Sequence, residues 1–341
     1  MREHSPVTLP AGLYRDPALF EAERKAIFAR SWLLIAHESQ MRVPGATVAM
    51  TVAGFRLMAV RQEDGTIKAF HNVCRHRAGP LAPEGLSRCD GRIVCAYHGW
   101  RYALDGRLAA ARDFGPAEDF DPRGYGLFPL ASEIWRGFVF VNADVNAAPL
   151  LDAIAPLERR ARALDIERFA VPRMTSHDIA CNWKTYTENF LEGYHIGAVH
   201  PTLSASLATP YTAEVDPPAQ FYSAEPHKGA AVAGLWGWVW PSLGVNVYAD
   251  GILMERISPV DLKRTRLDYL WLFAEDAGDN AVAAQIEASA VTTREDIWIC
   301  EEVQKNLDAG IYETGRLSPR HERGVAWFQS EVARRIAETA R

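Results

Sequence analysis

The sequence predicts an α+β protein with two domains, and three observations support this. First, 341 residues exceed one typical domain of about 150 residues, which favours two. Second, residues 32–141 alternate short apolar segments with Pro-Gly and Asp-Gly turns, a pattern typical of antiparallel β structure. Third, the C-terminal half combines two long strand patterns, 243–257 and 264–274, with one long helix at 282–307.

The chain begins with a helical segment and changes texture after residue 31. Asp16 is a suitable N-cap, and Pro17 fits the first turn of a helix. Helical periodicity returns at residues 150–166 and over most of 177–200, beyond a polar link that contains alanine and proline. We therefore expect three segments, which are 1–31 (helical), 32–145 (antiparallel β) and 146–341 (α+β).

Composition and charge exclude several classes of protein. The net charge of −6 argues against the broad basic surface that binds nucleic acid or anionic membranes. No apolar run approaches the roughly 20 residues of a membrane-spanning helix, and the first residues show no signal-peptide pattern. Five cysteines are too few for a disulfide scaffold. We expect a cytoplasmic protein whose cysteines are buried, metal-binding or catalytic.

Two short segments of the β domain each offer one thiolate and one imidazole. Cys74 and His76 lie in the first, and Cys95 and His98 lie in the second. A Rieske [2Fe–2S] centre needs two cysteines on one iron and two histidines on the other, so each segment provides one ligand to each iron. Zinc binds the same residue types, but zinc fingers have both cysteines before both histidines. The pattern favours a Rieske cluster, with zinc or four unrelated side chains as alternatives.

A second set of candidate ligands lies in the α+β domain. On one continuous helix, Glu188, Glu192 and His195 share a face, because they are four and three residues apart. A buried row of such groups is unfavourable unless they are paired or bind a metal. Glycine and proline near His200 indicate that the helix loosens there, which allows His200 to turn back toward the same point.

Two histidines need one carboxylate to form the facial triad of non-haem Fe(II) oxygenases. The C-terminal helix offers Asp296 on its apolar, inward face, whereas Glu295 is rotated away by about 100°. We therefore prefer Asp296 as the third ligand. The alternative is that His195 and His200 are two ordinary buried histidines.

The motifs around these residues resemble those of the Rieske non-haem iron oxygenases, also called the ring-hydroxylating oxygenase family. Residues 74–77 and 95–102 resemble its Rieske domain, and the Asn-Trp-Lys, Glu-Asn-Phe and Glu-x-x-His-x₄-His motifs of 182–200 resemble its catalytic half. The resemblance implies an antiparallel β Rieske domain followed by a helix-grip (START/SRPBCC-like) catalytic domain. It implies a [2Fe–2S] cluster on Cys74, His76, Cys95 and His98, and a mononuclear Fe(II) on His195, His200 and Asp296.

The resemblance also implies a function and partners. Glu192 takes the place of the carboxylate that bridges the iron site to a Rieske histidine of the neighbouring subunit in a homotrimer, and Asn189 is a candidate neighbour of the iron ligands. Glutamate at 192 resembles the branch that acts on choline, betaine or carnitine. The implied activity is that of a terminal oxygenase component. It uses O₂ and electrons from NAD(P)H, passed through a separate reductase with or without a ferredoxin, to hydroxylate or N-demethylate a small organic substrate.

The substrate is less well indicated. Trp236, Trp238 and Trp240 occupy alternate positions, so in a strand they face one side, and with Tyr248 they are candidates for a substrate pocket. They suit a trimethylammonium group through cation–π attraction, an aromatic ring, or simply the core. An aromatic-ring dioxygenase is one alternative function, and a non-catalytic Rieske electron-transfer or sensor protein is a more distant one.

Overall fold

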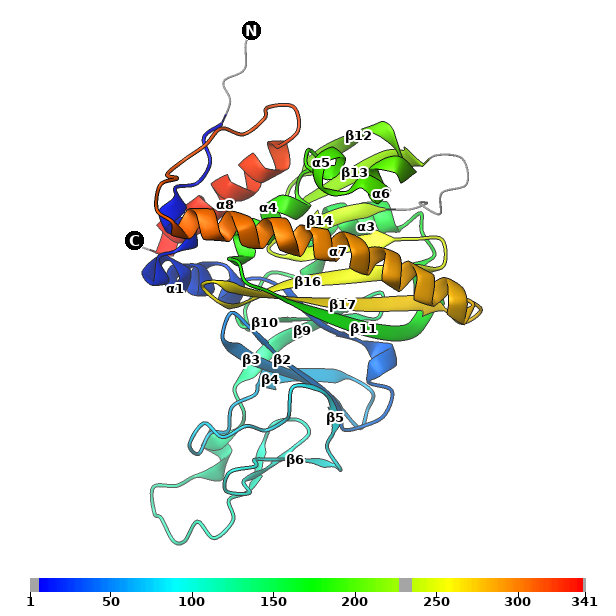
Figure 1. Cartoon of the computed structure of the whole chain (residues 1–341). Helices are drawn as coiled ribbons and strands as arrows, with labels where there is room; N and C mark the ends of the chain where they lie inside the picture. Colours follow the sequence, from blue (N-terminus) through cyan, green and yellow to red (C-terminus); the bar gives the residue numbers. More distant parts are fainter. Residues whose placement is uncertain (1–5, 227–234, 340–341) are drawn as a thin grey trace. The chain divides into compact units, whose positions relative to one another are not determined.

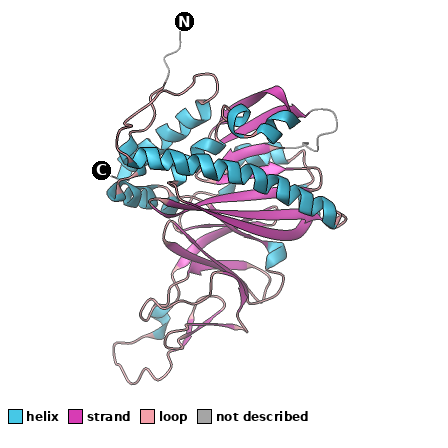
Figure 2. Cartoon of the chain, viewed as in Figure 1, coloured by secondary structure: helices cyan, strands magenta, loops and turns pink. Residues whose placement is uncertain are grey.

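The structure is a computed structural model that describes residues 6–226 and 235–339 (Figure 1). Its internal contacts divide the chain into two compact units, which we call the β unit and the mixed unit. The β unit is Ala29–Leu150, and the mixed unit combines the residues up to Phe28 with those from Leu151 onward. Strands dominate the β unit, whereas long helices and a second sheet make up the mixed unit (Figure 2). The class is α+β, as the sequence predicts.

Seven antiparallel strands form the larger sheet of the β unit, in the order β1-β10-β9-β4-β3-β2-β5. The turn between β2 and β3 is a two-residue hairpin, in which Ala53 and Gly54 both have positive φ, as this turn type requires. The sheet consists of β1 (Leu33–His37), β2 (Ala46–Val52), β3 (Phe55–Arg61), β4 (Ile67–His71), β5 (Gly85–Arg88), β9 (Pro129–Trp135) and β10 (Phe138–Asn142). Two 3-10 helices, η3 (Glu38–Gln40) and η4 (Pro122–Tyr125), lie in its connections.

A smaller sheet of three strands completes the β unit. It contains β6 (Arg92–Val94), β7 (Arg101–Ala103) and β8 (Leu108–Ala110), in that order. Buried residues of this sheet and of β3 and β4 share one apolar cluster, to which Cys74 and Cys95 belong. The loops that follow β4 and β6 therefore begin from a packed base, and these are the loops that carry the four candidate cluster ligands.

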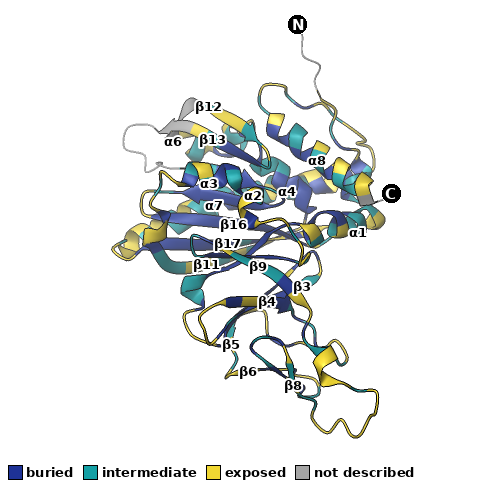
Figure 3. Ribbon diagram, turned by 180° about the vertical axis from the view of Figure 1, so that it is seen from behind, coloured by how far each residue is buried: buried dark blue, intermediate teal, exposed yellow. Residues whose placement is uncertain are grey.

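The mixed unit is built on a second antiparallel sheet, in the order β11-β17-β16-β15-β14-β13-β12. Burial extends along most of β16 and β17, because this sheet is covered by other elements (Figure 3). The strands are β11 (Phe169–Ile179), β12 (Leu207–Asp216), β13 (Ala219–Pro226), β14 (Trp236–Val239), β15 (Leu243–Val247), β16 (Gly251–Asp261) and β17 (Arg264–Ala274).

The long helix α7 (Asp279–Asp308) runs across this sheet (Figure 1). It begins three residues before the predicted start and ends before Gly310, whose φ of 75° favours glycine. No helix in residues 6–226 or 235–339 is long and apolar enough to cross a membrane. Two further helices, η2 (Phe28–Arg30) and α2 (Leu150–Ala153), span the boundaries between the units. The remaining helices of the mixed unit are η1 (Ala11–Tyr14), α1 (Pro17–Ala26), α3 (Ala155–Ala161), η5 (Ile166–Arg168), α4 (Trp183–Phe190), α5 (Ile196–Val199), α6 (Pro201–Ser206) and α8 (Arg323–Thr339).

The N-terminal helix α1 packs with the mixed unit, where it contacts α8. Its start is as predicted, since the side chain of Asp16 accepts a hydrogen bond from the backbone N–H of Ala18 and Pro17 opens the helix. Glu23 of α1 forms a fully buried ion pair with Lys184 of α4, at 2.6 Å. This contact joins the first helix of the chain to the segment that leads into the second metal site.

Two helical expectations are wrong in detail. Residues 177–200 do not form one helix, because the chain leaves β11, forms the two-turn helix α4, turns, and then forms the short α5. Helix α4 ends at Phe190, and in the turn that follows a Cβ atom at Gly193 would lie 2.7 Å from the ring of Tyr211, so this position requires glycine. Residues 150–166 likewise divide into α2 and α3, with proline in the first turn of α3.

Candidate metal centres and the adjoining cavity

Hydrogen bonds within and between the two loops of the β unit fix the first candidate centre. The backbone N–H of Cys74 bonds to the carbonyl of Gly79 at 2.9 Å, and that of Cys95 bonds to the carbonyl of Trp100 at 2.8 Å. The N–H of Ala96 donates across to the first loop, at 3.2 Å from the Pro80 carbonyl. The two loops therefore form one cradle.

The side chains in this cradle suit a metal cluster. The rings of His76 and His98 lie 4.5 Å apart, and His76 stacks on Trp100. The Nδ1 atoms of both histidines are buried, and neither has a hydrogen-bond partner among the described residues. Buried nitrogens without a partner are unfavourable in a folded protein, so we expect a bound group to contact both Nδ1 atoms. Cys74 and Cys95 are both buried beside them.

Shape and charge at this centre agree with the same interpretation. A Cβ atom at Gly79 would lie 2.7 Å from the sulfur of Cys95, so only glycine leaves the space beside that thiol open. Burial and the nearby His76 lower the pKa of His98, which favours the neutral imidazole that binds metals. Burial raises the pKa of the Cys74 thiol, so a bound cation is needed to hold it as thiolate at neutral pH.

Tyr102 is a neighbour of this centre that the sequence analysis did not single out. Its hydroxyl lies 3.1 Å from the sulfur of Cys74 and accepts a hydrogen bond from the backbone N–H of Arg75. The phenol proton is therefore free to point at the sulfur. Hydrogen bonds to ligand sulfurs tune the reduction potential of iron–sulfur clusters.

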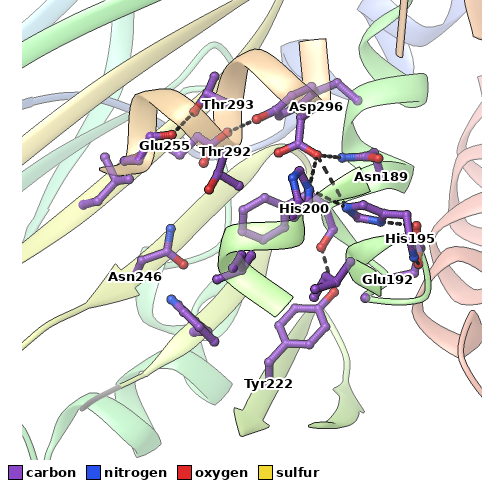
Figure 4. Close-up of a pocket in the computed structure, with 18 of the residues that line it drawn as sticks. Asn189, Glu192, His195, His200, Tyr222, Asn246, Glu255, Thr292, Thr293 and Asp296 are labelled. Carbon is purple, nitrogen blue, oxygen red and sulfur yellow. Dashed lines mark hydrogen bonds and ion pairs between the residues drawn. The ribbon is translucent and has the colours of Figure 1, made fainter. Parts of the chain in front are cut away.

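The second candidate centre forms where three segments of the mixed unit meet. Asn182 caps α4 by accepting a hydrogen bond from the N–H of Lys184. Beyond α4 the chain turns, and α5 places His195 immediately before its first residue and His200 immediately after its last. Asp296 projects from α7. Figure 4 shows the two histidines and the carboxylate pointing toward one another.

The three ligand atoms converge closely. The Nε2 atoms of His195 and His200 are 3.1 Å apart, and Oδ1 of Asp296 lies 3.0 Å from the Nε2 of His200 and 3.4 Å from that of His195. His200 is almost fully buried. These three residues are a group that could hold a metal ion, and two histidines with one carboxylate are the facial triad of non-haem iron sites.

Glu188, which the helical pattern placed on the same face, does not join them. Because α4 ends at Phe190, Glu188 instead points to the N- and C-terminal elements. Its carboxylate accepts hydrogen bonds from Tyr14 at 2.6 Å and from Gln329 at 3.0 Å. Burial raises the pKa of Glu188 to about 7.

Each histidine also has a carboxylate on its other ring nitrogen. Glu192 hydrogen-bonds to Nδ1 of His195, and Oε2 of Glu295 lies 2.7 Å from Nδ1 of His200. Asn189 donates to Oδ1 of Asp296 at 2.6 Å. Partners of this kind fix the tautomer and orientation of metal-binding histidines. The helical periodicity predicted that Glu295 is rotated away from the site. The prediction missed the role of Glu295, because its carboxylate reaches His200 from the side.

Proton equilibria at this centre reflect the same contacts. Burial lowers the pKa of His195, but hydrogen bonds to Asp296 and Glu192 outweigh this effect and raise it to about 9. Burial raises the pKa of Asp296, while its hydrogen bonds to the two histidines lower it below the usual value.

A cavity of about 210 Å³ adjoins the three converging residues (Figure 4). Trp236 and Tyr248, two of the candidate substrate-pocket residues, belong to its described lining. Trp238 and Trp240 are not part of its described lining, and they pack instead against Trp327 and Phe328 of α8. The other lining residues are Tyr186, Asn189, Phe190, Glu192, Gly193, His195, Ile196, His200, Leu203, Tyr211, Tyr222, Asn246, Leu253, Glu255, Tyr269, Ser289, Thr292, Thr293 and Asp296.

Comparison with known proteins gives matches over nearly the whole chain. Residues 31–121 match the Rieske [2Fe-2S] domain, and residues 166–234 and 210–338 match the ring hydroxylating alpha subunit catalytic domain. The carnitine monooxygenase oxygenase subunit of Escherichia coli (strain K12) is 32% identical over 353 residues, which cover 96% of this chain and 93% of that protein.

Two further matches agree. The glycine betaine monooxygenase oxygenase subunit of Pseudomonas aeruginosa is 28% identical over 399 residues, which cover 99% of this chain and 91% of that protein. The crystal structure of the quaternary ammonium Rieske monooxygenase CntA in complex with L-carnitine superposes with a TM-score of 0.87 at 29% identity, covering 97% of this chain and 96% of that one. These matches confirm the resemblance that the sequence motifs indicated.

Proposed function

Because the chain belongs to the Rieske-type ring-hydroxylating oxygenase family, we propose that it is the terminal oxygenase component of a multicomponent monooxygenase. The observation that carries the proposal is the convergence of His195, His200 and Asp296 beside a cavity, in a chain that also has a Rieske domain. The names of the carnitine and glycine betaine relatives support a quaternary ammonium compound as the substrate, which would be hydroxylated or oxidatively N-demethylated.

The unpartnered histidine nitrogens of the β unit and the converging ligands of the mixed unit fit the two iron centres of this family. A [2Fe–2S] cluster on Cys74, His76, Cys95 and His98 would supply single electrons, and Fe(II) on His195, His200 and Asp296 would supply O₂ activation.

The chain's own side chains prepare the second site for this chemistry. Glu192 and Glu295 hold the two imidazole rings so that both Nε2 atoms face one point. Asn189 holds the carboxylate of Asp296 through one oxygen. About half of the described residues that line the cavity are aromatic or aliphatic, and these side chains exclude water from a bound substrate.

We further propose that Glu192 carries electrons between subunits of a homotrimer, where it would bridge His195 to a cluster ligand of the neighbouring subunit. Its contact with Nδ1 of His195 supports this assignment. A separate reductase would deliver electrons from NAD(P)H, and this agrees with the absence of a glycine-rich dinucleotide fingerprint from the sequence.

Iron content and turnover together test the proposal. With a surrogate reductase, the purified protein is expected to contain about three irons per chain and to release formaldehyde from an N-methylated substrate. His195→Ala should retain the Rieske absorption, lose about one iron per chain and lose product formation. His177→Ala is the matched control, because this histidine of the same unit packs on Tyr269 and does not join the ligand cluster.

Two alternative functions correspond to specific outcomes. Wild-type protein that holds only the cluster irons and reacts with no substrate would be an electron-transfer or sensor protein. Product formed only from aromatic compounds would make the chain an aromatic-ring dioxygenase. The acidic lining of the cavity favours neither alternative, because it suits a cation.

A further inference from the structure

Carboxyl groups, and neither lysine nor arginine, line the described part of the cavity beside the converging histidines. Its described lining contains three carboxylates, those of Glu192, Glu255 and Asp296, and neither lysine nor arginine occurs in that described lining. Glu192 and Asp296 are engaged with histidines. Glu255 takes part in neither of these contacts with the histidines, so its carboxyl group is available to a bound ligand.

The alternation of β16 directs Glu255 into the cavity. Its neighbour Arg256 points to the opposite side of the sheet, where its guanidinium lies 3.6 Å from the carboxylate of Asp268. Glu255 is 3% exposed, and its Oε1 accepts a hydrogen bond from the hydroxyl of Tyr186 at 2.9 Å. Among the described residues, no basic side chain forms an ion pair with it. A buried carboxylate without a cation is unfavourable unless a ligand completes it.

Aromatic side chains surround the same space. Tyr186 and Tyr269 present their hydroxyls near Glu255, and Trp236 and Tyr248 belong to the same lining. Aromatic faces attract cations that cannot donate hydrogen bonds, because the ring quadrupole replaces the lost hydration. A methylated ammonium group is such a cation, and a carboxylate at the end of an aromatic pocket complements its charge.

The remaining polar groups of the cavity are neutral. Asn246, Ser289 and Thr292 offer an amide and two hydroxyls, and Figure 4 shows Asn246 and Thr292 at the cavity. These groups hydrogen-bond to a hydroxyl or an amide of a substrate. A substrate carboxylate would find neither lysine nor arginine in the described lining and would lie near the carboxyl groups of Glu255 and Asp296, and groups of like charge at close quarters lower affinity.

From this charge pattern we infer that the site selects a methylated ammonium cation whose other end is uncharged, and that Glu255 is its counter-ion. This inference rests on the proposed function, since it names the substrate class of the same site. It separates compounds like choline, whose tail is a neutral hydroxyl, from zwitterions like carnitine and glycine betaine, whose tail is a carboxylate. Glu255 is thus a specificity-determining residue.

Three probes of nearly equal size test both parts of the inference. Choline is the cation with a neutral tail, 3,3-dimethylbutan-1-ol is its uncharged isostere, and glycine betaine carries the carboxylate. Binding to the full-length, iron-loaded protein is measured by calorimetry without O₂ or reductase. We expect choline to bind at least tenfold more tightly than either of the others. Equal binding of choline and glycine betaine overturns the neutral-tail assignment, and equal binding of choline and the isostere overturns the cation site.

Variants of Glu255 assign the effect to one residue. Glu255→Gln keeps an acceptor for Tyr186, so it should fold, lose about tenfold or more in choline affinity, and bind the isostere unchanged. Glu255→Asp retains the charge and should retain the preference for choline over the isostere. The control variant is Glu214→Gln. Glu214 is an exposed residue of β12, in the same sheet, and it pairs with Arg160 of α3. Unchanged choline affinity in Glu255→Gln overturns the assignment.

The binding measurement also separates this inference from the proposed function. If choline binds selectively but is never oxidised by the reduced, iron-loaded protein, the proposed function fails and the cation site stands. If N-methyl compounds are oxidised but Glu255→Gln has the wild-type ratio of kcat/KM for choline and glycine betaine, the proposed function stands and the inference fails.

Discussion

Oε2 of Glu295 lies 2.7 Å from Nδ1 of His200, on the side of the imidazole ring opposite the nitrogen that faces Asp296. This contact comes from the residue directly before Asp296 on α7, so one turn of the helix holds the ring from two directions. Carboxylates in this position raise the basicity of a metal-binding histidine and fix its tautomer.

We therefore expect Glu295→Ala to weaken iron binding by about 10- to 100-fold while the Rieske spectrum is retained. Iron retention after dialysis against a graded chelator measures the effect. Glu302→Ala is the control, because this carboxylate lies on the same helix but pairs with the exposed Lys305. Identical iron retention in Glu295→Ala and wild type would contradict a supporting role.

Tyr102 should set part of the potential of the cluster. Its hydroxyl lies 3.1 Å from the sulfur of Cys74, and a hydrogen bond to a ligand sulfur favours the more negative, reduced state. Tyr102→Phe removes the bond and is expected to lower the potential by on the order of 40 mV, equivalent to about 1 kcal/mol for one electron. A redox titration followed by absorbance measures this. A potential that rises or stays constant would show that the hydroxyl does not donate to the sulfur.

The affinity for a cationic substrate should increase with pH. Burial raises the pKa of Glu255 to about 8, with Asp296 of α7 adding to this and the hydroxyls of Tyr186 and Tyr269 opposing it. A bound cation favours the ionised carboxylate. Below pH 8, binding therefore releases a proton, and the Kd for choline should fall by up to about tenfold per pH unit before levelling off above pH 8.

Calorimetry between pH 6 and pH 9 measures this dependence. Buffers with different ionisation enthalpies report the released proton directly. Glu255→Gln should show a flat profile, and so should 3,3-dimethylbutan-1-ol with the wild type. A wild-type profile that is also flat would mean that Glu255 does not titrate with the ligand.

Trp236 and Trp238 should respond to substitution in opposite ways. Trp238 is fully buried and packs on Phe328 of α8, so Trp238→Ala should cost about 3–5 kcal/mol of stability. Trp236 lines the cavity, so Trp236→Ala should raise KM with little change in the melting temperature. Thermal unfolding and steady-state kinetics on both variants test this division. Equal losses of stability would mean that the two residues share one packing role.

The buried pair of Glu23 and Lys184 should be important for the mixed unit as a whole. Both side chains are inaccessible, and Glu23 also accepts a hydrogen bond from Trp183 at 2.8 Å. Glu23→Ala leaves a buried ammonium without a negatively charged partner and should destabilise the protein by about 3–5 kcal/mol. In the exposed Lys305–Glu302 pair, Glu302→Ala should change the free energy of unfolding by less than about 1 kcal/mol. Denaturant titration compares the two.

Local sequence patterns were sufficient for the fold class, and they indicated candidate ligands that the structure brings close together. Cys74, His76, Cys95 and His98 lie in two short loops whose spacing is a property of the chain itself, and the structure brings the histidine rings together. The α+β class follows from strand and helix periodicities that span ten residues or more. These features need no knowledge of distant contacts.

The errors arise where distant segments meet. The helix predicted through Glu192 ends at Phe190, and the ring of Tyr211, from strand β12, packs beside Gly193 in the turn that follows. Trp238 and Trp240 are not in the described cavity lining, because they pack against α8, almost ninety residues further along the chain. Glu295 gains its role only from the position of His200. Periodicity describes one element at a time and cannot anticipate such contacts.

The contact between α1 and α8 affects the order in which the two units can fold during synthesis. The β unit, Ala29–Leu150, is one uninterrupted stretch of sequence, whereas the mixed unit needs helices from both ends of the described chain. During synthesis from the N-terminus, the β unit can be complete while α1 still waits for a helix that begins at Arg323. The β unit can therefore fold on the ribosome first, and the mixed unit is completed only after α8 has emerged.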